Sequence, residues 1–281
     1  MGEVAEHKVY VARHESAKEV HVAGEAVQFG KNHGRADGLR VCKGGCELGS
    51  VGTFTTFGLH VFSLKFPPAT IQIRFYRRAL IGPTGAKNLM TNLEKAYSGD
   101  IAIRIVDEKL PPQGIAIAVD EFDKDGVVYE KDGVKVTAFE VDHGDVIKPA
   151  YGYRIDYKGH SAVISGDTRY NTNVIKYGTG VDLLVHEVAL ARPELMTNLF
   201  AQAIIAHHTS PKDCGRVFTQ AKPKLAAYTH LVFLSNEKVP EATLDDLIKQ
   251  TRETYDGPLE VGEDLTSFEI DDTVTVTRWK Q

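Results

Sequence analysis

Two stretches of alternating apolar and polar residues predict β-hairpins from residue 127 onward. Residues 127–141 alternate on both sides of Asp132-Gly133, a dipeptide that favours the type I′ turn of a tight hairpin. Residues 151–165 alternate in the same way on both sides of a Lys-Gly pair. Each hairpin is expected to contribute two antiparallel strands to a sheet.

Helical periodicity and capping signals predict further elements around these hairpins. Ser210 is expected as a helix N-cap, with Pro211 at the first helical position and Asp213 completing a capping box. The predicted helices cover residues 82–97, 210–221 and 240–255, and the remaining predicted strands cover residues 182–188, 224–231 and 259–279. Strands that alternate with helices and hairpins imply a layered α/β architecture.

The first 79 residues carry a much weaker pattern than the rest. Residues 51–66 and 70–78 have the composition of strands, whereas residues 30–52 are largely polar and rich in glycine. A long structureless stretch is unusual inside a compact domain. We therefore predict an atypical N-terminal segment over residues 1–79 and one α/β domain over residues 80–281.

Length and charge narrow the class of protein. The chain has 281 residues, enough for one large α/β domain, and no apolar run approaches the roughly 18 residues of a membrane span. The first 20 residues are too charged for a signal peptide, so we expect a cytoplasmic protein. Residues 1–95 carry 13 Lys and Arg against 8 Asp and Glu, and residues 96–281 carry 20 against 30. A local basic patch can still bind RNA, so this balance leaves the substrate open.

The three cysteines indicate reduced thiols. They are Cys42, Cys46 and Cys214, an odd number in a chain that carries no secretory signal. Cys42 and Cys46 are separated by Lys-Gly-Gly, and no second ligand pair at zinc-site spacing accompanies them. A flexible loop is the favoured interpretation of this pair.

Histidines and acidic residues gather at the predicted strand ends. Of the 11 histidines, none lies between residues 61 and 142, and six lie between residues 143 and 230. The polar residues that end apolar runs are His143, Asp167, His186, Glu187, His207, His208 and His230. Imidazole and carboxylate groups are good ligands for zinc or manganese, and a carboxylate can bridge two ions.

A structural role must be weighed for each of these side chains. A single histidine at a strand end is more often a hydrogen-bonded structural residue than a ligand, but five such events in one region favour a site. His160 lies in a hairpin turn, where solvent contact is the simpler interpretation. His207 and His208 are adjacent, and a position facing the core is the structural alternative for one of them. Asp142 and Asp145 flank His143 and are either orienting groups or surface charges.

The ordered motifs resemble those of a known family. VDHG, SGDT, DLLVHEV, HHTSPKDCGRVF and YTHL resemble, in that order, the later motifs of metallo-β-lactamase-fold proteins of the RNase Z (tRNA 3′ endonuclease) type. The resemblance covers roughly residues 80–281 and implies an αββα sandwich. Members of the wider superfamily include phosphodiesterases, lactonases, arylsulfatase-like enzymes and β-lactamases.

The resemblance also implies roles for six residues. His143, Asp167 and His230 match metal ligands, with Asp167 as the bridging carboxylate. His208 matches the histidine that protonates the leaving group, Glu187 matches the carboxylate that orients it, and His186 is a weaker catalytic candidate. The implied cofactor is one or two zinc ions, with manganese or iron as alternatives. The implied partners are a small-molecule or RNA-like phosphodiester substrate and a second copy of the chain in a homodimer, without a membrane.

One hallmark of this family is missing. The string His-x-His-x-Asp-His, which supplies up to four ligands, does not occur, and the fragments around His33 and His60 do not fit it. Three matched ligands are enough for one metal with an open position, or they leave the site poor in metal. One hypothesis is that about 75 N-terminal residues come from a frameshift, a fusion or a divergent exon, which translating the source DNA in all three frames would test.

We therefore expect a metal-dependent hydrolase that cleaves phosphodiesters with a metal-activated water, in the manner of RNase Z. The first alternative is hydrolysis of β-lactams, lactones or esters by the same site. The second is a degenerate, non-catalytic binding protein. A serine hydrolase is disfavoured, because neither GHSAV at 159–163 nor GSVG at 49–52 satisfies G-x-S-x-G.

Overall fold

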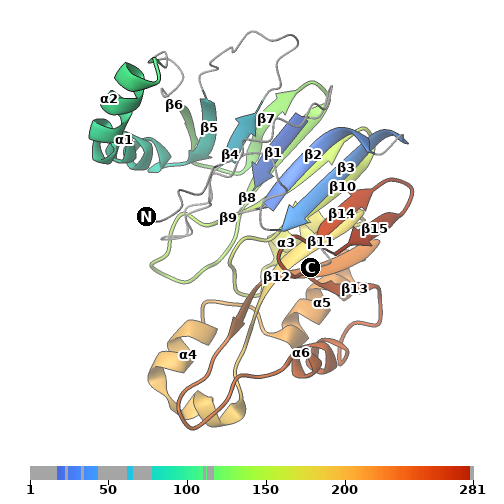
Figure 1. Ribbon diagram of the computed structural model, residues 1–281. Helices are drawn as coiled ribbons and strands as arrows, with labels where there is room; N and C mark the ends of the chain where they lie inside the picture. The colour runs from blue at the N-terminus through green and yellow to red at the C-terminus, as the bar shows by residue number, and fades with distance from the viewer. Residues whose placement is uncertain are drawn as a thin grey trace, which may run out of the picture.

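The computed structural model describes residues 18–22, 25–32, 35–43, 62–65, 78–109, 112 and 117–278. Two β-sheets face each other, and helices pack on their outer sides (Figure 1). None of the helices in these ranges has the length and apolar character needed to cross a membrane.

The first sheet joins both ends of the chain. Its strand order is β15-β14-β3-β2-β1-β4-β5-β6. The strands are β1 (Lys18–Val22), β2 (Glu25–Asn32), β3 (Arg35–Lys43), β4 (Phe62–Lys65), β5 (Arg78–Pro83), β6 (Ile117–Phe122), β14 (Ser267–Ile270) and β15 (Val274–Thr277). β14 pairs antiparallel with β3, with Ile270 opposite Leu39. The sheet therefore draws on both sides of the division predicted at residue 79, and that division stays a prediction.

The second sheet carries the predicted hairpins. Its strand order is β13-β12-β11-β10-β9-β8-β7, from β7 (Gly126–Lys131), β8 (Val134–Glu140), β9 (Tyr151–Tyr157), β10 (His160–Ile164), β11 (Leu183–Leu190), β12 (Leu225–Phe233) and β13 (Leu259–Val261). Asp132 and Gly133 have φ of 55° and 83°, and Lys158 and Gly159 have 48° and 88°. Positive φ at both central residues is the mark of the type I′ turn, so both hairpin predictions are confirmed.

From β10 to β13 the second sheet is parallel. β10 pairs with β11, β11 with β12 and β12 with β13, each in parallel register. Parallel neighbours end at one edge of a sheet, which is where open α/β sheets carry their ligands. This edge holds the polar residues singled out in the sequence.

Helices complete the layers. They are α1 (Ala86–Ala96), α2 (Ser98–Asp107), α3 (Thr172–Gly178), the 3₁₀ helix η2 (Pro193–Thr197), α4 (Leu199–Ile205), α5 (Pro211–Ala221) and α6 (Leu244–Thr251). α1 packs on β5 and β6 of the first sheet, and its N-terminal amides of Gly85 and Lys87 donate to Glu121 Oε1. α3 and α5 pack on the second sheet.

Capping explains where two of the predicted helices begin. Ser210 is the N-cap of α5, as predicted, and its hydroxyl accepts from the backbone amide of Asp213. The Asp213 carboxylate accepts from the Ser210 hydroxyl rather than from its backbone amide, so the predicted capping box is not complete. α6 begins after Thr243, which forms a complete capping box with Asp246. The cap places the start of α6 four residues beyond the predicted position at 240.

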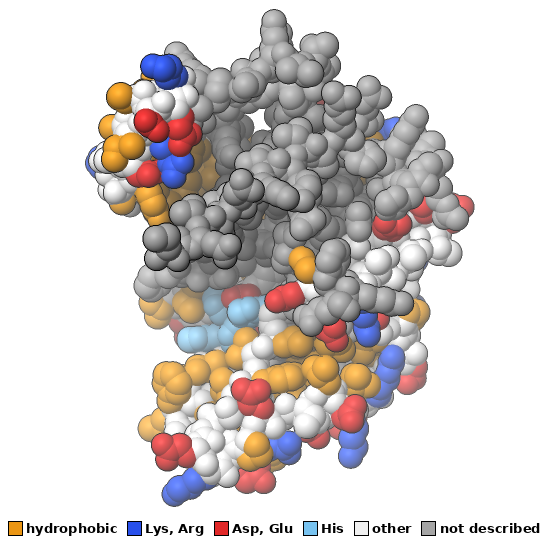
Figure 2. All heavy atoms as spheres, in the orientation of Figure 1, with side chains coloured by type: hydrophobic (Ala, Val, Ile, Leu, Met, Phe, Trp, Pro, Cys, Tyr) orange, Lys and Arg blue, Asp and Glu red, His pale blue; other side chains and the backbone are white. Residues whose placement is uncertain are grey.

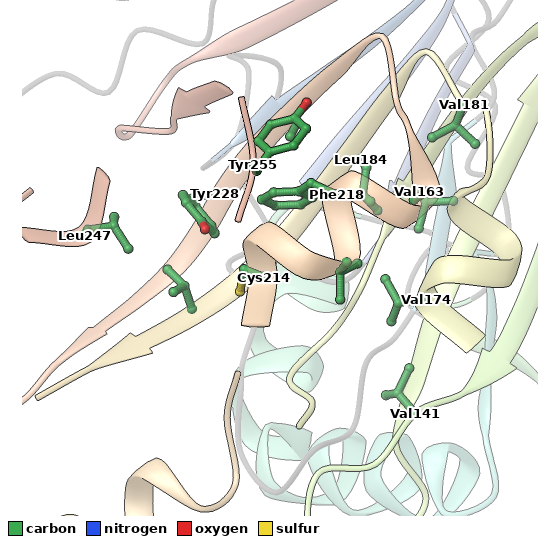
Figure 3. Close-up of a cluster of buried hydrophobic side chains, with 14 of the residues drawn as sticks. Val141, Val163, Val174, Val181, Leu184, Cys214, Phe218, Tyr228, Leu247 and Tyr255 are labelled. Atoms are coloured by element: carbon green, nitrogen blue, oxygen red, sulfur yellow. The ribbon is translucent and has the colours of Figure 1, made fainter. Parts of the chain in front are cut away.

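Two apolar clusters hold the layers together. One lies between the sheets and contains Val136, Tyr153, Ile155, Phe268 and Ile270. The other lies between the second sheet and α3, α5 and α6, and its members include Leu184, Val174, Phe218, Tyr228 and Leu247 (Figure 3). The order helix, sheet, sheet, helix is the αββα sandwich of the metallo-β-lactamase fold expected from the motifs.

The N-terminal strands differ from the sequence prediction. β2 and β3 run through much of the glycine-rich stretch that has no local strand signal. Their backbone pairs with β1 on one side and β14 on the other, so partner strands rather than local pattern define them. His33, His60 and Cys46 lie outside the described residues, as do residues 70–77 of the strand expected over 70–78.

Candidate functional site

Three of the predicted metal ligands meet at the edge of the second sheet. His143 follows β8, Asp167 follows β10 and His230 lies within β12. The Nε2 atoms of His143 and His230 lie 3.8 Å and 3.5 Å from the same atom, Asp167 Oδ2. The fold therefore brings together residues that are separated by up to 87 positions in the chain.

When the ring is neutral, the hydrogen bond made by Nδ1 of His143 leaves Nε2 available to bind a cation. His143 Nδ1 lies 3.0 Å from the backbone carbonyl oxygen of His207. A carbonyl oxygen can only accept, so Nδ1 carries the hydrogen and Nε2 of the neutral ring presents a lone pair. That lone pair faces the Asp167 carboxylate, which also only accepts when ionised. A cation, or a second proton on the ring, between these two groups would satisfy both, and metal-bound histidines are held by such outer hydrogen bonds.

The three side chains are of the kinds that bind a divalent ion, and one of their two distances to Asp167 matches the spacing of ligands on one ion. Zinc binds nitrogen and oxygen at about 2.0–2.2 Å, so two ligands of one ion lie roughly 3–3.5 Å apart. The Asp167–His230 distance of 3.5 Å meets this spacing, and the His143–Asp167 distance of 3.8 Å is slightly wider. Within the described ranges, no three His, Cys, Asp or Glu side chains gather closely enough to form a metal site. A complete site needs further donors or a small contraction.

His208 and Glu187 form a hydrogen-bonded pair beside these donors. His208 Nδ1 lies 3.0 Å from Glu187 Oε2, and Glu187 is almost fully buried. The other carboxylate oxygen, Oε1, accepts from the backbone amide of Thr209 at 2.8 Å. Burial lowers the pKa of His208, but the hydrogen bond and the charge of Glu187, together with the charge of Asp167, outweigh it and raise the pKa. Glu187 thus holds His208 in place and favours its protonated form.

His208 stands at the centre of the cluster. Its ring centroid lies 5.1 Å from that of His143 and 5.6 Å from that of His230. Figure 2 shows histidine side chains grouped at the surface between the described upper and lower parts of the molecule. The five residues His143, Asp167, Glu187, His208 and His230 therefore form one continuous arrangement.

A β-bulge aims His230 toward Asp167. Thr229 pairs with Glu187 and Leu231 with Val188, so His230 is an extra residue without a partner in β11. Its φ is 44°, a left-handed conformation that costs a non-glycine residue of order 1–2 kcal/mol. Bulges near active sites redirect side chains, and the strain here falls on a candidate metal ligand.

His186 lies apart from this arrangement. It is fully buried, its ring meets that of Phe218 edge-on, and the sulfur of Cys214 lies 3.7 Å from its Nδ1. Burial lowers its pKa, although the charge of Glu187 and its backbone carbonyl act in the opposite direction. Nε2 has no hydrogen-bond partner. Neighbouring residues of a strand point to opposite faces, which is why Glu187 enters the cluster and His186 enters the core.

The remaining histidines take two positions. His160 lies in the hairpin of β9 and β10, away from the cluster, and its Nδ1 is 4.0 Å from Asp182 Oδ2. His207 is only partly buried. Its ring occupies the space that a side chain on Gly144 would need, because His207 Cδ2 lies 2.8 Å from the ideal position of a Cβ there. Gly144 also has a φ of 108°. Both facts require glycine directly after His143.

Sequence reasoning missed Arg169, which joins the loops of two candidate ligands. Its Nη2 lies 2.7 Å from Asp142 Oδ1 and 3.0 Å from Asp145 Oδ1. Its backbone amide donates to the carbonyl oxygen of Asp142 at 2.7 Å. The hydrogen bond of Arg169 is the main cause of a lowered pKa at Asp142. The position directly after the SGDT motif was the available signal, but its partner across the fold could not be inferred.

Comparisons with known proteins identify relatives of the chain. A family profile described as a beta-lactamase superfamily domain matches residues 94–231. A ribonuclease Z of Mycolicibacterium gilvum is 31% identical over 197 residues, which are 68% of this chain and 65% of that protein. A ribonuclease Z of Mycobacterium avium is 30% identical over 200 residues, 68% of this chain and 67% of that protein. The chain thus spans slightly less than two thirds of the first relative.

A solved structure is similar at lower identity. The metallo-beta-lactamase fold protein YhfI from Bacillus subtilis matches with a TM-score of 0.49 and 16% identity, over 90% of this chain and all of that chain.

Proposed function

Because the chain belongs to the beta-lactamase superfamily, in its ribonuclease Z-like metallo-β-lactamase branch, we propose that it hydrolyses phosphodiester bonds with the help of a divalent metal ion. The family expected from the motifs is confirmed, and with it membership of a hydrolase family. The phosphodiester substrate, the metal and the activity are the proposal.

The pair of His208 and Glu187 carries this proposal. A protonated imidazole held by a buried carboxylate is suited to deliver a proton to a leaving oxygen. Glu187 lies 3.0 Å from His208 Nδ1, and this contact leaves Nε2 as the nitrogen that is free to act. His208 also adjoins the rings of His143 and His230, so a substrate held there lies within its reach.

His143, Asp167 and His230 would hold the metal ion. When bound, such an ion lowers the pKa of water and offsets negative charge on a phosphoryl oxygen. As water adds to phosphorus and releases one proton to solvent, the bond from phosphorus to the leaving oxygen breaks. His208 Nε2 gives its proton to that oxygen, and the imidazole regains a proton from solvent. Glu187 keeps His208 oriented and stabilises its positive charge through the cycle.

Hydrolysis of bis(p-nitrophenyl) phosphate tests the proposal. We expect turnover by the zinc- or manganese-loaded protein, loss of turnover with a chelator, and loss in a variant that combines Asp167→Ala and His230→Ala. His160→Ala is the matched control, because His160 lies outside the cluster. Full activity in the double variant would rule this function out.

One observation favours the alternative of a non-catalytic member of the family. No three potential ligands in the described part of the chain form a closed metal site. A protein that binds no zinc, manganese or iron after reconstitution would support this alternative. The cytoplasmic location, the homodimer and the domain division at residue 79 also stay predictions.

A further inference from the structure

Two buried threonines lie between the loops that carry the candidate site. Thr168 directly follows Asp167 and is fully buried, and Thr209 directly follows His208 and is 1% exposed. The Thr209 hydroxyl lies 2.6 Å from the backbone carbonyl oxygen of Thr168. A carbonyl oxygen can only accept, so the hydroxyl donates. This hydrogen bond connects the loop of a candidate metal ligand with the loop of the candidate acid.

The backbone of Thr209 holds the His208 segment to strand β11. Its amide donates to Glu187 Oε1 at 2.8 Å, and its carbonyl oxygen accepts from the amide of Ala189 at 3.0 Å. Both partners belong to β11, and Glu187 also holds the His208 ring. These contacts fix His208 relative to β11. Its distance from the loop of Asp167 depends on the contacts between the two loops.

The loops of His143 and Asp167 are joined into one unit by Thr168. Its hydroxyl accepts from the amide of Asp142 at 3.1 Å and donates to the carbonyl oxygen of Arg169 at 2.8 Å.

Among the described residues, two hydrogen bonds join this unit to the segment of His208. One links His143 Nδ1 with the carbonyl oxygen of His207, and the other is the bond from the Thr209 hydroxyl. Thr209 is therefore the partner that contributes a side chain without being a candidate ligand or the candidate acid.

We propose that Thr209 is a positioning residue, whose hydroxyl sets the distance between His208 and Asp167. The inference rests on the proposed hydrolysis, because it concerns how His208 reaches the leaving oxygen. A methyl group cannot lie as close to a carbonyl oxygen as this hydroxyl does, since carbon and oxygen approach only to about 3.3–3.6 Å. Replacing the hydroxyl by a methyl group would therefore part the loops by roughly 0.7–1 Å. A displacement of about 1 Å can cost about 100-fold in rate.

Thr209→Val and Thr209→Ser test this role, because valine has nearly the shape of threonine without the hydroxyl, and serine keeps the hydroxyl. The metal-loaded proteins are given methyl phenyl phosphate and methyl p-nitrophenyl phosphate, which differ only in the leaving group. Phenolate depends on a proton from His208 far more than p-nitrophenolate does. In Thr209→Val, we expect kcat to fall roughly 10- to 100-fold for the phenyl ester and much less for the p-nitrophenyl ester. KM and zinc affinity should change little, and Thr209→Ser should keep most of the wild-type kcat.

Thr254→Val is the matched control. The Thr254 hydroxyl donates to the carbonyl oxygen of Lys212, also at 2.6 Å, and joins α5 to the segment after α6. Its loss should lower the stability of the fold without changing kcat for either ester. Equal losses of kcat for the two esters in Thr209→Val would indicate general damage to the site and overturn the inference. An unchanged kcat for the phenyl ester would overturn it as well.

Crystal structures of the metal-free wild type and Thr209→Val test the same claim without turnover. We expect His208 to lie farther from Asp167 in the variant by roughly 0.7–1 Å. An unchanged separation would overturn the inference. If the wild type cleaves neither ester, the proposed function fails, and these structures then decide separately whether Thr209 sets the distance.

Discussion

Glu187 Oε2 lies 3.0 Å from His208 Nδ1, and this contact joins a fully enclosed carboxylate to the histidine at the centre of the cluster. The carboxylate is itself fixed by the amide of Thr209. The proton that His208 delivers in the proposed reaction therefore depends on a residue that never touches the substrate.

Glu187→Gln should slow the reaction most for substrates with poor leaving groups. Loss of general-acid support costs roughly 100-fold for an alkyl leaving group and much less for p-nitrophenolate, which leaves without a proton. Because Glu187 raises the pKa of His208, its removal lowers that pKa, and the alkaline limb of the pH–rate profile moves to lower pH. Glu194→Gln on η2 is the control. An unmoved alkaline limb would contradict the role of Glu187.

Gly144→Ala should destabilise the protein more than Gly159→Ala. Both glycines have positive φ, which costs alanine about 1 kcal/mol. A Cβ at Gly159 meets open space, whereas a Cβ at Gly144 lies 2.8 Å from the His207 ring. Urea unfolding measures the difference, which we expect to exceed about 1 kcal/mol because the His207 ring and the His143 loop must both move. Equal losses of stability in the two variants would contradict this expectation, because they would show that the loop of His143 accommodates the added Cβ without cost.

The turns and strands that carry the site were predictable because their signals are local. Asp132-Gly133 specifies a type I′ turn by the φ values that these two residues accept. The run DLLVHEV predicts a buried strand, and β11 is buried along its whole length. His143 and Asp167 follow such runs and emerge at one sheet edge, whereas His230 lies at a bulge within β12.

The features that sequence reasoning missed depend on contacts between distant segments. β2 and β3 are defined by pairing with β1 and β14. A glycine-rich polar stretch carries no local signal that predicts the pairing of β3 with β14, which lies more than 200 residues further along the chain. The choice between His186 and Glu187 depends on which face of β11 meets the histidines, because adjacent residues of a strand face opposite ways. The bulge at His230 likewise follows from the register of β11 and β12.

Arg169→Ala should weaken metal binding without a comparable decrease in the stability of the fold. Arg169 joins the loop of His143 to the loop of Asp167 through Asp142 and Asp145. Removing groups that orient metal ligands typically costs 10–100-fold in metal affinity, and we expect about tenfold here. Arg104→Ala is the control, because Arg104 also pairs with two carboxylates but lies on α2. Zinc titration by competition with a chromogenic chelator measures the affinity, and unchanged binding would refute the role of Arg169.

His186→Leu should leave catalysis intact and reduce sensitivity to acid. His186 is buried and its pKa is lowered, so the native state excludes a proton that the unfolded chain binds below about pH 6.5. Stability from this residue is present above that pH and is lost as pH falls, at about 1 kcal/mol per pH unit. The leucine variant does not lose this stability. The free energy of unfolding in urea should therefore differ less between pH 7.5 and pH 5.5 in the variant than in the wild type. A large drop in kcat in the variant would contradict this account and place His186 in the reaction.

Metal content is the most direct measurement of whether this chain works as a metal-dependent hydrolase. The protein is reconstituted with zinc, dialysed and subjected to elemental analysis, beside the variant that combines Asp167→Ala and His230→Ala. We predict that the wild-type protein retains about one zinc ion per chain, or more, and that the variant loses most of the bound zinc. A wild-type protein that retains no zinc, and equally no manganese or iron, would contradict the metal-dependent function outright.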